Sequence, residues 1–243
     1  MANKKKKKNH RKPVRKSSAL RRVLTQALPQ SITIAESDGE LKIDLACGQR
    51  PREGFHGVDI VGGEGITKLN VLEYPWPWAD SSVSILHCSH FIEHVPAIEV
   101  GPDGSAVPYG TGQDALFRFF DEAWRVLKPD GLMEIIWPSS RSDRAFWDPT
   151  HRRFLPQQFT MYLNQAWRVG QSLDHYNVHC NFIDSSNFTI DPAMQTLSDD
   201  ARTRHFNNYW NTIIDFYSKL RAIKPGSAQP DTVAPAGNFV LAK

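Results

Sequence analysis

The chain has 243 residues, 40% of them hydrophobic, which is enough for one substantial core and is most simply interpreted as one domain with tails and insertions. No apolar run approaches the ~20 residues that a membrane span requires. The basic start lacks the apolar segment of a secretory signal, so we expect a cytoplasmic protein with no membrane span.

Charge is distributed unevenly along the chain. Residues 1–22 hold eleven Lys or Arg and no acid, which leaves 18 basic residues against 26 acidic ones, a net charge of −8, in the rest. Because like charges repel and bury nothing, we expect a disordered tail over 1–18. Residues 4–22 can bind nucleic acid or an anionic surface weakly, or can simply keep the chain soluble.

The three cysteines, Cys47, Cys88 and Cys180, are odd in number and widely spaced. Each lies in a predicted strand or strand end, where a buried thiol packs like a small hydrophobic side chain. We predict neither a disulfide nor a zinc site.

Apolar periodicity predicts alternating helices and strands. The spacing over Leu20–Leu28 is helical and stops at Pro29. Strands are expected at 41–46, 56–60, 66–70 and 83–88. A helix is expected over Gln113–Lys128, and the strand Leu132–Trp137 follows a turn. Strand, helix and strand in this order predict a right-handed crossover and a parallel sheet.

The second half of the chain is less regular. Residues 138–158 are rich in Ser, Arg, Asp and Pro and follow a strand, so 138–160 is the predicted substrate lid. A strand is predicted over His175–Ile183. The rest is predicted to hold a helical insertion over 186–222, with an amphipathic helix at 203–222, a linker at 224–237 and a closing edge strand at 238–242.

Two short segments indicate a nucleoside site. The apolar run that begins at Leu41 ends in the small-residue turn Ala46-Cys47-Gly48, and the next strand ends at Asp59. In an open α/β sheet, backbone N–H groups of such a turn approach the ligand, and the carboxylate binds the ribose hydroxyls. The pattern therefore predicts an adenosine cofactor.

Six segments, taken in order, resemble class I S-adenosylmethionine (SAM)-dependent methyltransferases: 43–48, 54–60, 74–83, 89–95, 122–131 and 148–154. The resemblance implies a Rossmann-like α/β sheet, mostly parallel with an antiparallel C-terminal strand and helices on both faces. The element Asp148-Pro149-Thr150-His151 is similar to that of an uncharacterised group in bacteria and their phages. A phage-encoded protein of this kind would act in the host cytoplasm.

The resemblance also implies a SAM-binding set and a catalytic set. The SAM-binding residues are expected to be Asp44, Ala46, Cys47, Gly48, Asp59, Asn70, Ser89 and His90. Two features depart from the family pattern: Ala46 and Gln49 flank a single glycine, and Asn70 stands where an aspartate is usual. Both departures weaken the expected fit to the cofactor.

The catalytic candidates are His151, His90 and Asp148. A histidine is mostly neutral at pH 7, so His151 on the lid suits a general base, with Asp148 orienting it or binding substrate. The alternative is that Asp148-Pro149-Thr150-His151 is only a rigid turn.

A metal site is the alternative role for some of these side chains. His90, Glu93, His94 and His151 can converge on an ion, but the Glu-x-x-His sites of di-iron bundles need two copies, and the chain has one. We predict no metal.

The expected function is methyl transfer from SAM to a small molecule, a sugar or a nucleotide. One alternative is a non-catalytic SAM-binding or nucleoside-binding module, which the departures at Ala46, Gln49 and Asn70 allow. Another is a nucleic-acid methyltransferase recruited by the basic arm, although an Asp/Asn-Pro-Pro-Tyr motif is absent. A nicotinamide-dependent oxidoreductase is disfavoured because the chain lacks G-x-G-x-x-G.

Overall fold

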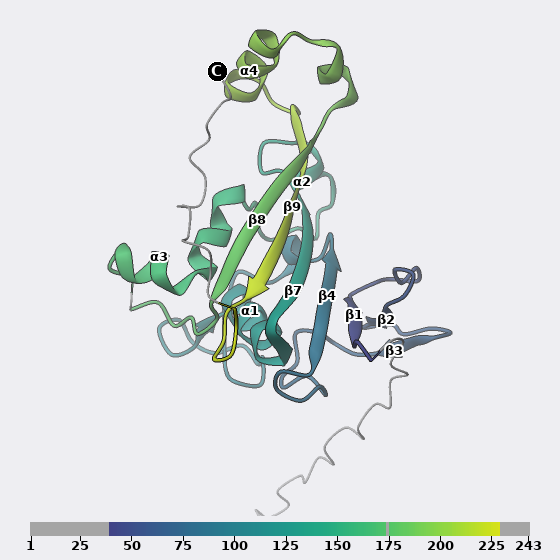
Figure 1. Cartoon of the computed structure of the whole chain (residues 1–243), viewed down its shortest axis with the longest axis vertical. Coiled ribbons are helices and arrows are strands. Elements are labelled where there is room, and N and C mark those ends of the chain that lie inside the picture. Colours follow the sequence, from purple (N-terminus) through teal and green to yellow (C-terminus); the bar gives the residue numbers. More distant parts are fainter. Residues whose placement is uncertain (1–38, 174, 229–243) are drawn as a thin grey trace, which may run out of the picture. The chain divides into compact units, whose positions relative to one another are not determined.

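A computed structural model of the chain describes residues 39–173 and 175–228. Its main feature is a seven-stranded sheet of order β3-β2-β1-β4-β7-β9-β8 (Figure 1). The strands are β1 (Lys42–Leu45), β2 (His56–Asp59), β3 (Ile66–Lys68), β4 (Val83–Ser89), β7 (Leu127–Pro138), β8 (Phe182–Ile190) and β9 (Ile213–Ala222). Five neighbouring strands pair in parallel, in the order β3, β2, β1, β4 and β7, whereas β9 is antiparallel to both of its neighbours. This order confirms the Rossmann-like methyltransferase sheet and the first four predicted strands.

Helices and a small hairpin complete the described chain. The α-helices are α1 (Ala115–Val126), α2 (Arg144–Trp147), α3 (Gln165–Gly170) and α4 (Asp199–Asn208). The 3-10 helices are η1 (Ile92–His94), η2 (Gln157–Leu163) and η3 (Pro192–Thr196), and β5 (Glu99–Val100) pairs with β6 (Gln113–Asp114). None of the helices between residues 39 and 228 is long and apolar enough to cross a membrane.

Helix α1 confirms the helix predicted over Gln113–Lys128. The Asp114 side chain accepts a hydrogen bond from the Leu116 N–H and so satisfies a free donor at the first turn. The apolar face of α1 is buried through Phe119 and Phe120, and Phe119 contacts Trp76 and Phe91. The helix thereby supplies much of the aromatic core on one face of the sheet.

The opposite face of the sheet carries charge. Strand register places Asp44, His87, Glu134 and Lys219 opposite one another on four adjacent strands. The Arg52 guanidinium, on the loop between β1 and β2, bonds to both His87 and Glu134. This row is therefore stabilised by mutual charge pairing and by the loop that covers it.

The helix predicted at 203–222 is wrong beyond Asn208. Helix α4 ends there, and residues 213–222 form β9, the antiparallel strand of the sheet. Buried residues alternate along β9 at Phe216, Ser218, Leu220 and Ala222, which is a period of two. Pairing with β7 and β8 on both sides outweighs the helical spacing of the aromatic residues.

Two related predictions also need correction. Residues 175–181 form a loop, and the strand predicted at His175–Ile183 begins only at Phe182. The helical insertion over 186–222 is wrong because β8 continues to Ile190 and pairs with β9, so only η3 and α4 between them are helical. The tail at 1–18, the helix at 20–28 and the strand at 238–242 lie outside the described residues.

The core around α1 generates a stability prediction. Phe119 is 0% exposed, so Phe119→Ala is expected to lower the free energy of unfolding by ~3–5 kcal/mol, through lost burial and the cavity that remains. Urea unfolding followed by circular dichroism measures the change. The matched control is Val169→Ala, because Val169 is 58% exposed. It is expected to change the free energy of unfolding by less than ~0.5 kcal/mol.

Candidate functional site

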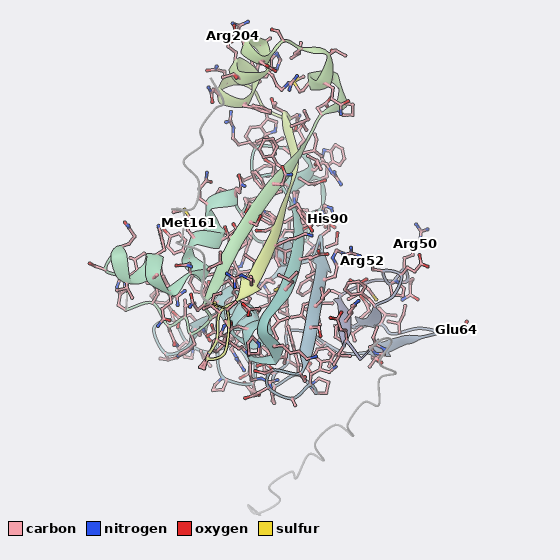
Figure 2. The ribbon with its side chains drawn as sticks, in the orientation of Figure 1. Arg50, Arg52, Glu64, His90, Met161 and Arg204 are labelled. Atoms are coloured by element: carbon pink, nitrogen blue, oxygen red, sulfur yellow. The ribbon has the colours of Figure 1, made fainter. Side chains whose placement is uncertain are left out.

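The order of the strands creates a crevice between β1 and β4. The chain steps from β1 outward to β2 and β3, then returns to place β4 on the other side of β1. Ligands of open α/β sheets bind at the carboxyl ends of the strands at such a switch point. A cavity of about 340 Å³ lies here, lined by Asp44, Ala46, Cys47, Arg50, Arg52, His87 and Ser89. Figure 2 shows Arg50, Arg52 and His90 near this edge of the sheet.

The turn after β1 contains two residues with left-handed backbone. Ala46 and Gly48 have positive φ values of 53° and 60°, and a Cβ at Gly48 would meet open space. A left-handed alanine is strained, and such strain is concentrated at functional sites. The segment from Gly48 to Asp59 forms no helix, as its length predicts.

The carboxylate of Asp59 holds this turn. Its Oδ2 accepts a hydrogen bond from the Gly48 N–H at 3.0 Å, and its Oδ1 accepts one from the Val61 N–H at 2.9 Å. A carboxylate has about four lone-pair sites, so each oxygen can accept a further hydrogen bond. Asp59 therefore faces the turn and retains acceptor capacity for a ribose diol.

Burial tunes the ionisable groups at the base of the cavity. Asp44 accepts a hydrogen bond from the Arg52 N–H at 2.8 Å, but burial raises the pKa of its carboxyl. Burial also lowers the pKa of His87, which keeps that imidazole neutral at pH 7. Burial opposes ionisation of Glu134 too, but hydrogen bonds from Arg52 and Lys219 bring its pKa below the usual value.

Two of the departures from the family pattern have local roles. The Asn70 amide donates to Glu73 and its oxygen accepts from the Leu72 N–H, so the side chain closes its own turn. Gln49 donates to the Gly62 carbonyl at 3.0 Å. Both side chains are therefore engaged in hydrogen bonds of the loops around them.

The catalytic candidates lie around Glu93, next to Ser89 at the end of β4. His90 has a positive φ of 53°, and its Nδ1 is 3.4 Å from Glu93 Oε1. His151 Nε2 is 4.0 Å from the same oxygen. The His90 side chain is 39% exposed and that of His151 is 9% exposed, so the His90 imidazole is the more accessible of the two.

The hydrogen bonds of Asp148 go to Thr150 rather than to His151, the partner expected from the sequence. Its Oδ1 accepts hydrogen bonds from both the N–H and the hydroxyl of Thr150, at 2.7 and 2.6 Å. The ring of His151 is instead oriented by the Ala145 carbonyl, 2.7 Å from Nδ1. The predicted lid, residues 138–160, is also tied to η1, because the N–H groups of Arg152 and Arg153 donate to the Glu93 carbonyl.

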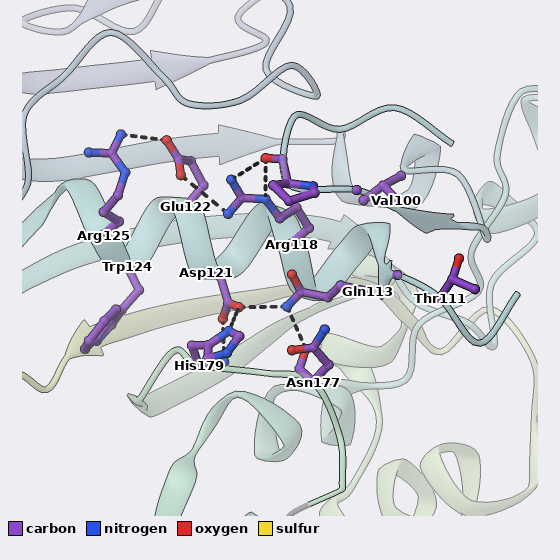
Figure 3. A pocket seen from close by; sticks show the side chains of 13 residues that line it. Val100, Thr111, Gln113, Arg118, Asp121, Glu122, Trp124, Arg125, Asn177 and His179 are labelled. Atoms are coloured by element: carbon purple, nitrogen blue, oxygen red, sulfur yellow. Dashed lines mark hydrogen bonds and ion pairs between the residues drawn. The ribbon is translucent and has the colours of Figure 1, made fainter. Parts of the chain in front are cut away.

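A second, larger cavity of about 490 Å³ lies along α1 (Figure 3). Asp121 there accepts hydrogen bonds from Gln113, from the ring and N–H of His179 and from the Cys180 N–H. Glu122 is bonded to the Trp76 N–H and to Arg125. These polar groups satisfy one another, so we interpret this cavity as structural.

Three residues of the switch-point cavity were missed by the sequence analysis: Arg50, Arg52 and His87. Arg50 and Arg52 follow Gly48 on a loop that is too short to form a helix. The short loop keeps both residues close to the strand ends, and this could have been inferred from the sequence. His87 interrupts an otherwise apolar strand, which marks a polar position in the sheet. The contacts of Arg52 and His87 with Glu134, 47 residues beyond His87, are not visible in the sequence.

No protein-family model matches the chain, and no curated protein matches it. Among solved structures, it is similar to a SAM-dependent methyltransferase from Archaeoglobus fulgidus, with 16% identity, a TM-score of 0.48 and coverage of 76% of this chain and 86% of that one. It is also similar to a SAM-dependent methyltransferase from Mesorhizobium loti, with 13% identity, a TM-score of 0.38 and coverage of 77% and 93%. At these values neither match carries an argument about activity.

The strain at Ala46 is directly testable. Ala46→Gly removes a left-handed penalty of ~1–2 kcal/mol and adds ~0.5–1 kcal/mol of unfolded-state entropy, so we expect a net stabilisation of ~0.5–1 kcal/mol. Urea unfolding measures it. Ala123→Gly, inside α1, is the matched substitution and is expected to destabilise by ~1 kcal/mol or more. Equal effects at both positions would contradict the assignment of strain.

A second prediction concerns the Cys47 thiol. Burial, with the nearby charges of Asp44 and Asp59, raises its pKa from 9.0 to about 11. Because the thiolate is the reactive form, alkylation at pH 8 is expected to be ~100-fold slower than for a free thiol of pKa 9. The rate should still rise about tenfold per pH unit from 8 to 10, whereas an ordinary thiol begins to level off.

Mass spectrometry locates the label. Cys88 and Cys180 are buried and are expected to react only after unfolding, so they are internal controls. Rapid labelling of Cys47 at pH 8, or a rate that levels off near pH 9, would show that its pKa is not raised.

Proposed function

We propose that the chain transfers a methyl group from SAM to an acceptor held between the switch point and the lid. The observation that carries the proposal is the cavity between the ends of β1 and β4, which is lined in part by the strained turn at Ala46. The Asp59 carboxylate does not line the cavity, but it is hydrogen-bonded to Gly48 of the same turn. The cavity volume of about 340 Å³ falls in the range of small-ligand sites.

The residues present fit the cofactor. Asp59 would accept hydrogen bonds from the ribose diol, and the backbone of Ala46-Cys47-Gly48 would lie under the nucleoside. Arg50 and Arg52 line the same cavity and would pair with the carboxylate of the methionine moiety. Bound SAM supplies a sulfonium-linked methyl group for in-line displacement, and the protein supplies alignment.

An aromatic surface lies on the lid beside His151. The rings of Phe146 and Phe154 stack with centroids 4.4 Å apart, and Phe146 is 6.0 Å from Trp210. Trp147, on the same helix as Phe146, is 75% exposed. We propose that this surface stacks on a ring of the acceptor, a sugar or a base, since exposed aromatic side chains bind such faces.

Protons released by the acceptor would pass to the histidines around Glu93. His90 is the more exposed of the sequence-predicted bases, and His151 lies behind it. Neutral imidazoles are effective proton acceptors near pH 7. Asp148 acts at a distance in this scheme, through its hydrogen bonds to Thr150.

The alternative is a module that binds SAM without transferring its methyl group. The occupied side chains of Asn70 and Gln49 favour it, because neither is free to contact the cofactor as it stands. Release of S-adenosylhomocysteine in the presence of hydroxyl and amine acceptors separates the two functions. Binding without release over a wide acceptor panel would support the module.

Asp59 provides the sharpest test of the cofactor site. Asp59→Ala is expected to weaken SAM binding by ~1–3 kcal/mol, or about 5- to 150-fold in Kd, through the lost ribose acceptor. Isothermal titration calorimetry measures the affinity, and circular dichroism checks that the variant is folded. Asp199→Asn, at a carboxylate 96% exposed on α4, is expected to bind as the wild type does. An unchanged affinity in Asp59→Ala would refute the ribose assignment.

A further inference from the structure

Three side chains that bear metal-ligand atoms meet beside the switch point, Glu93, His94 and His151, and His90 lies next to one of them, Glu93. These four residues are here termed the Glu93 cluster. One ligand atom from each of Glu93, His94 and His151 lies within 4.8 Å of the others. His90 Nδ1 is 3.4 Å from Glu93 Oε1. The cluster joins the end of β4 and helix η1 to the distant lid, so only the folded chain assembles it.

The Glu93 carboxylate is buried and has no hydrogen-bond partner among residues 39–173 and 175–228. The residue is 1% exposed, and both of its carboxylate oxygens are unpaired. Leaving a buried polar group unpaired costs ~1–3 kcal/mol, and more when the group is charged. A bound cation or a water molecule can satisfy such a group.

The histidines are oriented so that lone pairs remain for an ion. His151 Nδ1 lies 2.7 Å from the Ala145 carbonyl, which can only accept, so Nδ1 carries the proton and Nε2 is the free acceptor. The same Nε2 lies 4.0 Å from Glu93 Oε1. Metal-ligating histidines commonly donate their other ring N–H to a carbonyl or carboxylate in this way.

His94 is oriented by a longer chain of hydrogen bonds. The Thr150 hydroxyl donates to Asp148 Oδ1 at 2.6 Å, so it accepts from His94 Nδ1–H at 3.0 Å. His94 therefore also keeps an unprotonated Nε2. The motif Asp148-Pro149-Thr150-His151 thus supplies one ligand and the support for a second.

The backbone around the cluster is rigidly tied. The N–H groups of Arg152 and Arg153 donate to the Glu93 carbonyl at 2.7 and 3.0 Å. The Arg153 guanidinium bonds to the carbonyls of Val95 and Pro96. These bonds hold the lid against η1, so the ligand atoms are preorganised rather than brought together by a flexible loop.

We propose that the Glu93 cluster binds a divalent first-row transition-metal ion through Glu93, His94 and His151, with His90 as a fourth ligand. Imidazole nitrogen and carboxylate oxygen together suit Zn²⁺ and its neighbours better than Mg²⁺ or Ca²⁺. Two ligand atoms at ~2.1 Å from a tetrahedral ion lie ~3.4 Å apart, so small side-chain movements close the cluster. The proposal departs from the sequence-based prediction of no metal, and it does not depend on methyl transfer. A bound ion would occupy the lone pairs of His90 and His151, so metal binding and the proton-acceptor role proposed above are alternatives for these two side chains.

The experiment uses the full chain without a polyhistidine tag, stripped with EDTA. Titration with Co²⁺, followed by its visible absorption, and then with Zn²⁺, followed by calorimetry, measures stoichiometry and affinity. We expect one equivalent per chain and displacement of Co²⁺ by Zn²⁺. Glu93→Gln, which keeps the shape and removes the charge, is expected to weaken Zn²⁺ binding by at least ~10-fold.

Thr150→Val separates a built site from adventitious histidine binding. It removes the acceptor for His94 Nδ1–H without removing a ligand, and is expected to weaken Zn²⁺ binding by ~10- to 100-fold. His175→Gln, at an exposed histidine outside the cluster, is expected to bind as the wild type does. Less than one equivalent in the wild type, or unchanged affinity in Thr150→Val, would overturn the proposal even if Glu93→Gln failed to fold. SAM binding, measured separately, reports on the proposed function.

Discussion

Parallel pairing of β1 with β4 is the constraint on which the rest of the molecule depends. It places the ends of the two strands, Leu45 and Ser89, at one edge of the sheet, although they are 44 residues apart in the chain. A crevice forms between them because the crossovers on either side of β1 diverge. The strained turn at Ala46 and the left-handed His90 both lie at that edge. Local strain is therefore concentrated where a ligand can bind. The aromatic core on α1 stabilises the sheet and so offsets this strain.

The two faces of the sheet are stabilised in different ways. One buries aromatic and aliphatic side chains around Phe119 and Trp137, whereas the other carries the row from Asp44 to Lys219. The loop after Gly48 takes the place of a helix over this row and contributes Arg52. A short loop suffices there because charge pairing, rather than apolar burial, satisfies the groups beneath it.

The proposed cofactor cavity and the Glu93 cluster are separate sites that share one sequence segment. Ser89 lines the cavity and the next residue, His90, belongs to the cluster. An acceptor held between them would face the aromatic surface of the lid. Glu93 connects the predicted lid to the sheet edge. Its backbone carbonyl accepts hydrogen bonds from Arg152 and Arg153, and its side chain lies 4.0 Å from His151 Nε2.

The sequence by itself determined the alternation of strands and helix from 41 to 137 and the turn at 46–48, because each depends on local periodicity or short spacing. The hydrogen bond from Gly48 of that turn to Asp59 emerged only from the structure. Only the tertiary structure decided that 213–222 is a strand, since pairing on both edges overrides its helical pattern. It also decided which residues meet Glu93. His151 lies 58 residues further along the chain, and no local pattern encodes a contact that depends on how the lid folds back onto η1.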